Sequence, residues 1–133
     1  MTSQLIESYY RAFNARDYPA MLELLTDGVA HDVNQGRREH GRDRFASFLA
    51  RMDECYREQV IDLVVLADRS GARFAAEFTV VGKYLKAESG LPEASGQMYR
   101  LPAGAFFALE GGKIARVTTY YNVKAWLAQV GAP

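Results

Sequence analysis

Apolar residues in the N-terminal part of the chain recur at three- and four-residue steps, which is the spacing of one side of a helix. The first such stripe comprises Leu5, Ile6, Tyr9, Tyr10 and Phe13. A second helix is expected after Asp17, which can cap it, with an apolar side of Met21, Leu22, Leu24 and Leu25, and an end at Asp27–Gly28. The third and clearest stripe comprises Phe45, Phe48, Leu49, Met52 and Tyr56.

Beyond residue 57 the pattern changes to that of strands, which we expect at 60–66, 74–85, 97–109 and 114–121. The segment Pro102–Gly104 predicts a bend in the third of them. An earlier short strand is expected at 29–34, with His31 on one face and Asp32 and Asn34 on the other. Asn122 is expected to cap a last short helix that holds Trp126.

Helices followed by antiparallel strands predict one α+β domain over residues 1–133. Long strands with bulges curl a sheet, and we expect the helices to pack on its concave side and to enclose a pocket there. The opposite face of such a sheet still carries apolar residues. A homodimer that covers this face is therefore expected.

Composition narrows the classes of function. Sixteen basic residues balance sixteen acidic ones, which argues against a nucleic-acid or membrane partner. Cys55 is the single cysteine, so no internal disulfide can form. The start of the chain lacks the pattern of a signal peptide, which predicts a cytoplasmic location. Two histidines and one cysteine give no metal-ligand spacing, and no nucleotide-binding motif occurs, so neither a metal nor a cofactor is expected.

Five segments together resemble a known superfamily over nearly the whole chain. They are Tyr9–Asp17, Leu24–Val29, Gly41–Phe45, Gly111–Ile114 and Tyr120–Asn122. These segments resemble SnoaL-like and ketosteroid-isomerase-like proteins of the nuclear transport factor 2 (NTF2-like) superfamily. The resemblance implies a cystatin-like cone whose curved mixed or antiparallel sheet and three N-terminal helices enclose a pocket. For function it is weak, because this superfamily hosts several enzyme classes and plain binders.

The resemblance also indicates where catalytic groups would lie. In ketosteroid isomerases the first helix supplies a tyrosine to the enolate, and Tyr9 occupies the matching place. Their proton-shuttling aspartate falls on Val33 here, and their second aspartate falls on Gly104. Steroid isomerisation by that mechanism is therefore not expected. SnoaL-type cyclases depend on an aspartate near the end of the sheet, whereas residues 118–122 contain no acid.

His31 is the first candidate for proton transfer, because a near-neutral imidazole in an apolar interior can move a proton around pH 7. The alternative is a buried histidine that only satisfies a neighbour. Tyr9 is the candidate oxyanion donor, and Asp32 or Glu77 could orient the imidazole. Glu77 belongs to the less apolar face of its strand, which favours an ion pair at the dimer surface. The candidate ligand contacts are Phe13, Val33, Asn34, Phe78, Tyr99, Phe106 and Tyr120.

Three function classes remain open from the sequence. The first is a cofactor-independent isomerase, cyclase or dehydratase that acts on a small apolar carbonyl metabolite by acid–base proton transfer. The alternative is a non-catalytic dimeric module that binds a small apolar molecule. A third is a protein-interaction dimer with a vestigial pocket, which a cavity filled by aromatic side chains would favour.

Overall fold

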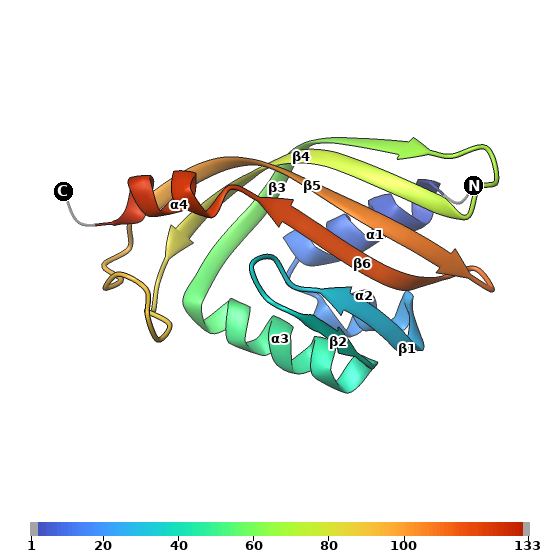
Figure 1. Cartoon of the computed structure of the whole chain (residues 1–133), viewed down its shortest axis with the longest axis horizontal. Helices are drawn as coiled ribbons and strands as arrows, with labels where there is room; N and C mark the ends of the chain where they lie inside the picture. The colour runs from blue at the N-terminus through green and yellow to red at the C-terminus, as the bar shows by residue number, and fades with distance from the viewer. Residues whose placement is uncertain (1–2, 132–133) are drawn as a thin grey trace.

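The computed structural model describes residues 3–131, and this part of the chain forms four helices and one sheet of six strands (Figure 1). The helices are α1 (Ser3–Asn14), α2 (Tyr18–Glu23), α3 (Arg42–Cys55) and α4 (Val123–Val130). The strands are β1 (Leu25–Asp32), β2 (Arg38–His40), β3 (Tyr56–Ala67), β4 (Arg73–Tyr84), β5 (Met98–Glu110) and β6 (Lys113–Tyr121). No helix within residues 3–131 is long and apolar enough to cross a membrane.

The sheet is mixed, with the strand order β2-β1-β6-β5-β4-β3. All neighbours are antiparallel except β1, which runs parallel to β6. The pairing of β3 with β4 shifts register between Ile61 and Val64, and Asp62 between them has a positive φ of 55°. Such an extra residue increases the local twist of a strand pair, which helps the sheet to curl.

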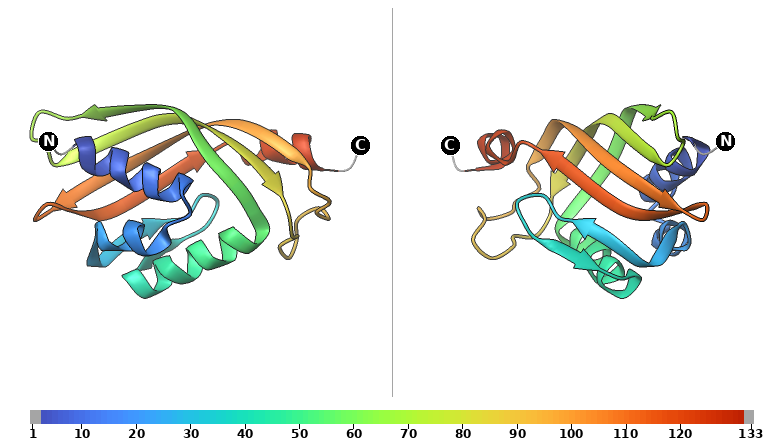
Figure 2. Two further views of the ribbon diagram at one scale, coloured as in Figure 1. Left: turned by 180° about the vertical axis from the view of Figure 1, so that it is seen from behind. Right: turned by 45° about the vertical axis from the view of Figure 1, so that its right-hand side comes forward.

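Helices α1, α2 and α3 cover one face of the curved sheet (Figure 2). The apolar stripe of α1 packs there through Ile6, Tyr9 and Tyr10, and that of α3 through Phe45 and Leu49. A separate cluster at the other end of the sheet holds α4, and its members are Tyr84, Tyr99, Leu101, Trp126 and Val130. The α+β prediction with three N-terminal helices is confirmed, and α4 adds the short helix expected after Asn122, whose side chain accepts a hydrogen bond from the amide of Ala125.

The predicted end of the second helix is wrong. Helix α2 stops at Glu23, and the residues from Leu25 onward already belong to β1. The amide of Ile114 on β6 donates to the carbonyl of Leu24 at 2.8 Å, and Leu25 pairs with Ile114. A strand edge almost ninety residues away therefore overrides the local preference for helix.

The predicted end of the third helix is also too late. Tyr56 was expected on the helical stripe, but it is the first residue of β3 and pairs with Tyr84 of β4. The short strand β2, which was not among the strands expected from the sequence pattern, pairs with β1. The earlier start of β3 has a consequence for the site, because it places Glu58 on the same strand face as Val60.

Candidate functional site

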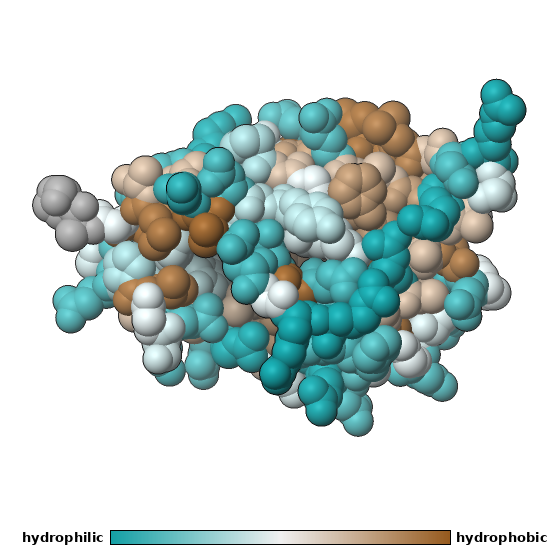
Figure 3. All heavy atoms as spheres, viewed as in Figure 1, coloured by the Kyte–Doolittle hydropathy of each residue, from teal (hydrophilic) through white to brown (hydrophobic). Residues whose placement is uncertain are grey.

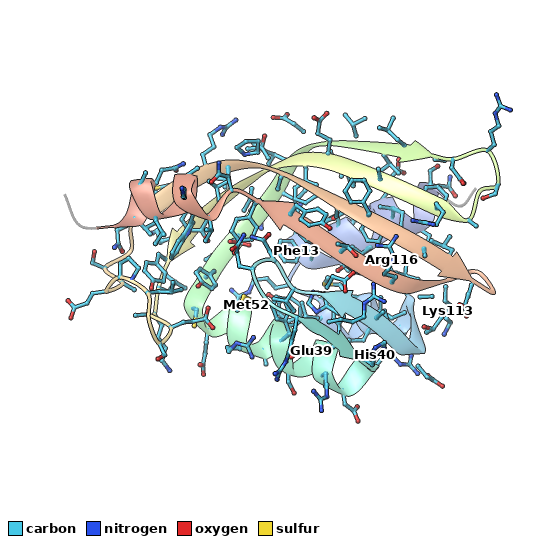
Figure 4. The ribbon with its side chains drawn as sticks, in the orientation of Figure 1. Phe13, Glu39, His40, Met52, Lys113 and Arg116 are labelled. Carbon is cyan, nitrogen blue, oxygen red and sulfur yellow. The ribbon has the colours of Figure 1, made fainter. Side chains whose placement is uncertain are left out.

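A cavity of about 350 Å³ lies between the inner face of the sheet and the helices, a volume suited to a small organic molecule. Figure 4 labels two of its lining residues, Phe13 on α1 and Met52 on α3. Most of the lining is apolar or aromatic, and it includes Tyr10, Met21, Phe45, Phe48, Leu49, Val60, Phe78, Val80 and Leu101. A few polar side chains interrupt this lining, and these decide what the cavity could do.

The register of the sheet decides which strand residues face the cavity. His31 pairs with Val117 of β6, and this row is buried on the inner face. Asp32 pairs with Thr118, which in turn pairs with the exposed Phe106 of β5, so this row belongs to the outer face. Since side chains alternate along a strand, the two neighbours His31 and Asp32 point to opposite sides of the sheet.

His31 lines the cavity and is only 5% exposed. Its ring packs against Phe45 and Phe48, with centroid distances of 4.5 and 4.6 Å. Burial lowers the pKa of His31 below its usual value of 6.5, partly opposed by the negative charges of Glu39 and Asp32. Its Nδ1 is buried and has no hydrogen-bond partner among the described residues. The imidazole is therefore neutral near pH 7, with a nitrogen that no protein group engages.

Tyr9 reaches the same cavity from α1. Its ring makes edge-to-face contacts with Tyr10 and Phe107, with centroid distances of 5.1 and 5.5 Å. Burial raises the pKa of the Tyr9 hydroxyl far above its usual range. The phenol therefore stays protonated at any physiological pH and remains a neutral hydrogen-bond donor.

Glu58 is a cavity residue that the sequence reasoning missed. It is partly exposed and lines the cavity from β3. The hydroxyl of Tyr99 donates to its Oε2 at 2.5 Å. Burial raises the pKa of the Glu58 carboxyl, and the Tyr99 hydrogen bond partly offsets this. The alternation of Tyr56, Glu58 and Val60 was a usable signal, but the assignment of Tyr56 to a helix concealed it.

A second missed carboxylate, Glu88, follows β4 and also lines the cavity. Both of its oxygens are engaged, one by the Tyr56 hydroxyl at 2.8 Å and the other by Arg51 Nε at 3.1 Å. Arg51 in turn lies 5.5 Å from the centroid of the Phe48 ring. These contacts tie α3 to the loop after β4.

Trp126, the only tryptophan of the chain, lines the cavity from α4.

Asp32 does not lie in the cavity, so the expectation that it could orient His31 is wrong. Its carboxylate accepts two hydrogen bonds from Arg38, at 2.6 and 2.9 Å, and one from the Thr118 hydroxyl at 2.6 Å. The bonds from Arg38 are the main reason that the pKa of Asp32 falls well below its usual range. Arg116, labelled in Figure 4, donates to Thr118 and completes this group.

Three other candidates lie on the outer face of the sheet. Glu77 is exposed there, which agrees with the face that its strand pattern favoured and excludes contact with a ligand inside the cavity. Phe106 and Tyr120 are 45% and 57% exposed and contact each other with a centroid distance of 5.9 Å. Both were expected to contact a ligand. On β6 the two neighbours of Tyr120, Thr119 and Tyr121, line the cavity instead, and on β5 the neighbour of Phe106 that is buried on the inner side is Phe107.

The remaining expected ligand contacts divide into two groups. Phe13, Val33, Asn34 and Phe78 line the cavity, and Asn34 also donates to the carbonyl of Tyr121 at 3.1 Å. Tyr99 lies behind the lining and reaches the cavity only through Glu58. Among residues 3–131, no group of three or more histidine, cysteine or acidic side chains is arranged to hold a metal ion.

Comparison with known proteins adds a family to this geometry. Residues 6–117 match the model of the SnoaL-like domain. A solved structure from Pseudomonas putida, described as a candidate polyketide cyclase, is 54% identical with a TM-score of 0.96, and the match covers 98% of both chains. A second protein so described, from Xanthomonas campestris, is 53% identical with a TM-score of 0.95 and covers 98% of this chain and 96% of its own.

More distant matches support the fold alone. An NTF2-like protein from Burkholderia xenovorans is 12% identical with a TM-score of 0.76, and the match covers 98% of this chain and 95% of that one. The search of curated proteins found none that matches. The architecture is thus that of the NTF2-like fold, as the resemblance of the sequence segments implied.

Proposed function

This chain belongs to the SnoaL-like domain family, and on that premise we propose that it is a cofactor-independent enzyme that closes a ring in a small apolar molecule bearing carbonyl groups. The observation that carries the proposal is His31, a buried and neutral imidazole in an apolar cavity, with no protein partner on Nδ1 in the described part of the chain. The candidate polyketide cyclases among the close relatives support the choice of substrate class.

In the proposed reaction His31 removes a proton from a carbon next to a carbonyl group. The electron pair of that C–H bond moves onto the carbonyl oxygen, and the Tyr9 hydroxyl donates a hydrogen bond to the resulting enolate. The enolate carbon then attacks a second carbonyl carbon of the same molecule. Apolar walls hold the two reacting ends together and exclude water, which would protonate the enolate before the ring closes.

The direction of the His31 pKa shift suits this role. A lowered pKa keeps the imidazole neutral at pH 7, so that it can accept a proton without first losing one. Tyr9 needs the opposite property, and its raised pKa prevents it from ionising when an enolate forms nearby. Neither group requires a metal or an organic cofactor for proton transfer.

The test uses diacetylpropane, an open-chain diketone whose carbonyl groups are separated by three methylene groups. In D2O, NMR follows both the exchange of hydrogens next to the carbonyls and the appearance of the cyclic hydroxyketone. His31→Asn is expected to lower both rates by about a hundredfold or more, which is the usual contribution of a general base. Tyr9→Phe should lower both as well, because one donor to the enolate is lost.

The matched controls are His40→Asn and Tyr120→Phe, since both residues lie at the surface and outside the cavity. Trp126 fluorescence reports binding of the diketone independently of turnover. Exchange that never exceeds the buffer rate would overturn the enzyme proposal. Quenching of Trp126 without exchange would then favour the alternative, a non-catalytic module that binds small apolar molecules.

We also propose that two copies of the chain associate through the outer face of the sheet. Exposed apolar side chains gather on that face (Figure 3), and they include Val64, Leu66, Phe106 and Tyr120. Leu66 and Phe106 share a row of the sheet through Ala75, which pairs with both. The patch is therefore continuous across β3 to β6 and has the character of an interface.

A further inference from the structure

The cavity contains two carboxylates, but only one of them is available to a ligand. Glu88 uses one oxygen for Tyr56 and the other for Arg51. Glu58 uses only Oε2, for the hydroxyl of Tyr99, and no hydrogen bond to its Oε1 occurs within the described residues. Glu58 also carries no salt bridge to a cation in this part of the chain. One oxygen of this partly exposed carboxyl group is thus left for a molecule in the cavity.

A row of three residues across neighbouring strands holds Glu58 in place. Glu58 of β3 pairs with Gly82 of β4, and Gly82 pairs with Tyr99 of β5. A Cβ atom at Gly82 would overlap the ring of Tyr99, so only glycine allows this ring to lie across β4. The tyrosine hydroxyl reaches the carboxylate two strands away for this reason. Gly82 therefore contributes to the position of Glu58, because it leaves room for the Tyr99 ring that bonds the carboxylate.

His31 and Glu58 approach the cavity from strands that are far apart in the sheet. His31 lies on β1 and Glu58 on β3, with β6, β5 and β4 between them. The strands bring two proton-transfer groups to one cavity only because the sheet curls around it. A single group that removes and returns one proton suffices for a simple isomerisation. Two groups on different walls fit a reaction in which a proton leaves at one site and another is delivered elsewhere.

We propose that Glu58 is a second catalytic residue, which protonates the oxygen of the carbonyl group attacked during ring closure, and that Tyr99 positions it through the gap at Gly82. This inference rests on the proposed function and assigns the acid that the His31 step lacks. The substrate class is accordingly an apolar molecule with two carbonyl groups, one that becomes the enolate and one that becomes the new hydroxyl.

The atoms balance without any further reactant. His31 takes the proton from the carbon next to the first carbonyl, and that carbon forms a bond to the second carbonyl carbon. The C=O π pair moves to the second oxygen, which takes the proton of the Glu58 carboxyl group. The product is an isomer of the substrate. Imidazolium and carboxylate then remain, and exchange with water returns His31 to neutrality and Glu58 to its acid form.

Burial keeps a proton on Glu58 to a higher pH than an ordinary glutamate allows, which an acid at this position needs. Tyr99 works against burial and stabilises the carboxylate. The other titratable and charged groups that line the cavity are Tyr9, Tyr10, His31, Arg51, Tyr56, Glu88 and Tyr121, and Tyr99 lies behind the lining. Glu58 also borders a small neighbouring pocket with Arg16, Tyr18, Asp53 and Arg57, where Arg16 is paired with Asp53. Arg51 is engaged by Glu88, so it does not neutralise Glu58.

The first experiment separates this inference from the proposed function by using both readouts on diacetylpropane. Glu58→Gln should leave deuterium exchange, which needs His31 and Tyr9, within about threefold of the wild type, while ring closure falls by about a hundredfold. Glu77→Gln, an exposed glutamate on the outer face of β4, should change neither rate. If Glu58→Gln lost both deuterium exchange and ring closure, or lost neither, the role of Glu58 would be overturned. Absence of exchange in the wild type would instead contradict the proposed function.

The second experiment tests Tyr99 through the pH profile of ring closure. The rate should rise with pH as His31 loses its proton and fall again as Glu58 loses its own. Tyr99→Phe removes the bond that lowers the Glu58 pKa, so the falling limb should move to higher pH. Gly82→Ala should move it in the same direction, because the added methyl group displaces the Tyr99 ring.

Two controls accompany these variants. Tyr84→Phe removes another buried hydroxyl, one that donates to the carbonyl of Pro92, and Gly104→Ala adds a methyl group where a strand has room for it. Both should leave the falling limb unchanged. If the falling limb of the pH profile did not move in Tyr99→Phe and Gly82→Ala, the proposal that Tyr99 positions Glu58 would be contradicted.

A third measurement needs no substrate. The folded chain binds the Glu58 proton more tightly than the unfolded chain, so ionised Glu58 destabilises the fold above the unfolded pKa of about 4.3. Glu58→Gln should therefore unfold at a higher temperature than the wild type at about pH 8, and the difference should shrink as the pH falls toward 4. If Glu58 had a merely structural role, Glu58→Gln would unfold at a lower temperature than the wild type. A lower unfolding temperature of Glu58→Gln at about pH 8 would therefore overturn the inference.

Discussion

At the scale of single residues, neighbours in the sequence acquire different chemistry from the side of the sheet they face. His31 turns inward, and burial lowers its pKa. Asp32 turns outward, and its bonds from Arg38 and Thr118 lower its pKa. Both pKa values are lowered, but for different reasons. The pKa of His31 falls because a buried charge is costly, and that of Asp32 falls because hydrogen bonds stabilise its negative charge. Only His31 keeps a free nitrogen, which is why it is the functional candidate of the two.

The Asp32 group predicts how stability depends on pH. The folded pKa of this carboxyl is depressed, so its stabilising effect is present above the unfolded value of about 3.9 and is lost as the pH falls through the folded value. Asp32→Asn should cost about 1 kcal/mol near pH 7, because the group is partly exposed to solvent.

Urea denaturation at several pH values measures this effect. The difference between Asp32→Asn and wild type should diminish at low pH, and the exposed Asp43→Asn should show little difference at any pH. A difference that stays constant down to about pH 2 would mean that the pairing with Arg38 does not act through the charge of Asp32.

At the scale of helices and strands, local patterns predicted which elements exist better than where they end. The apolar stripes of α1 and α3 are strong signals, because the apolar residues of each stripe recur at three- and four-residue steps, which is the helical period. The boundaries at Leu24 and Tyr56 were missed because pairing with distant strands decides them. The same boundary error hid Glu58, since it fell between the expected helix and the strand expected at 60–66 and was therefore not placed on a strand face.

One side chain connects the end of α1 to the edge of the sheet. The amide of Asn14 donates to the carbonyl of Val60 at 2.9 Å and accepts from its N–H at 2.8 Å, so it pairs with β3 as a neighbouring strand would. Asn14→Ala leaves both backbone groups without partners and should lower the free energy of unfolding by about 2 kcal/mol.

Equilibrium urea denaturation checks this prediction, with Asn34→Ala as the matched control. The Asn34 amide makes a single exposed hydrogen bond to Tyr121, so its loss should change the free energy of unfolding by less than about 0.5 kcal/mol. Equal effects of the two substitutions would show that α1 is held by its apolar stripe alone.

At the scale of the whole molecule, the curl of the sheet creates two unlike faces. The inner face and the helices enclose the cavity, while the outer face presents apolar side chains that no described element covers. The dimer proposed for this face predicts sedimentation at twice the mass of one chain. Phe106→Lys or Leu66→Lys should shift the protein to the monomer, because each places a charge within the patch.

Leu127→Lys is the control, since Leu127 is an exposed apolar residue on α4. It should leave the sedimentation of the protein unchanged. A wild-type chain that sediments as a monomer at concentrations of about 100 μM would contradict the dimer, because an interface built on such a patch is expected to bind more tightly than that.

The sequence by itself determined the helical stripes, the strand alternation and hence the α+β fold with His31 on a buried strand face, because these depend on local periods of 3.6 and 2 residues. The tertiary structure alone decided that Glu58 joins His31 in one cavity and that Phe106 and Tyr120 face away from it. These placements depend on register between strands and on the curl of the sheet, which bring together residues from β1, β3 and β5. Pairing across such distances arises from many weak contacts summed over the whole fold, and no local segment encodes it.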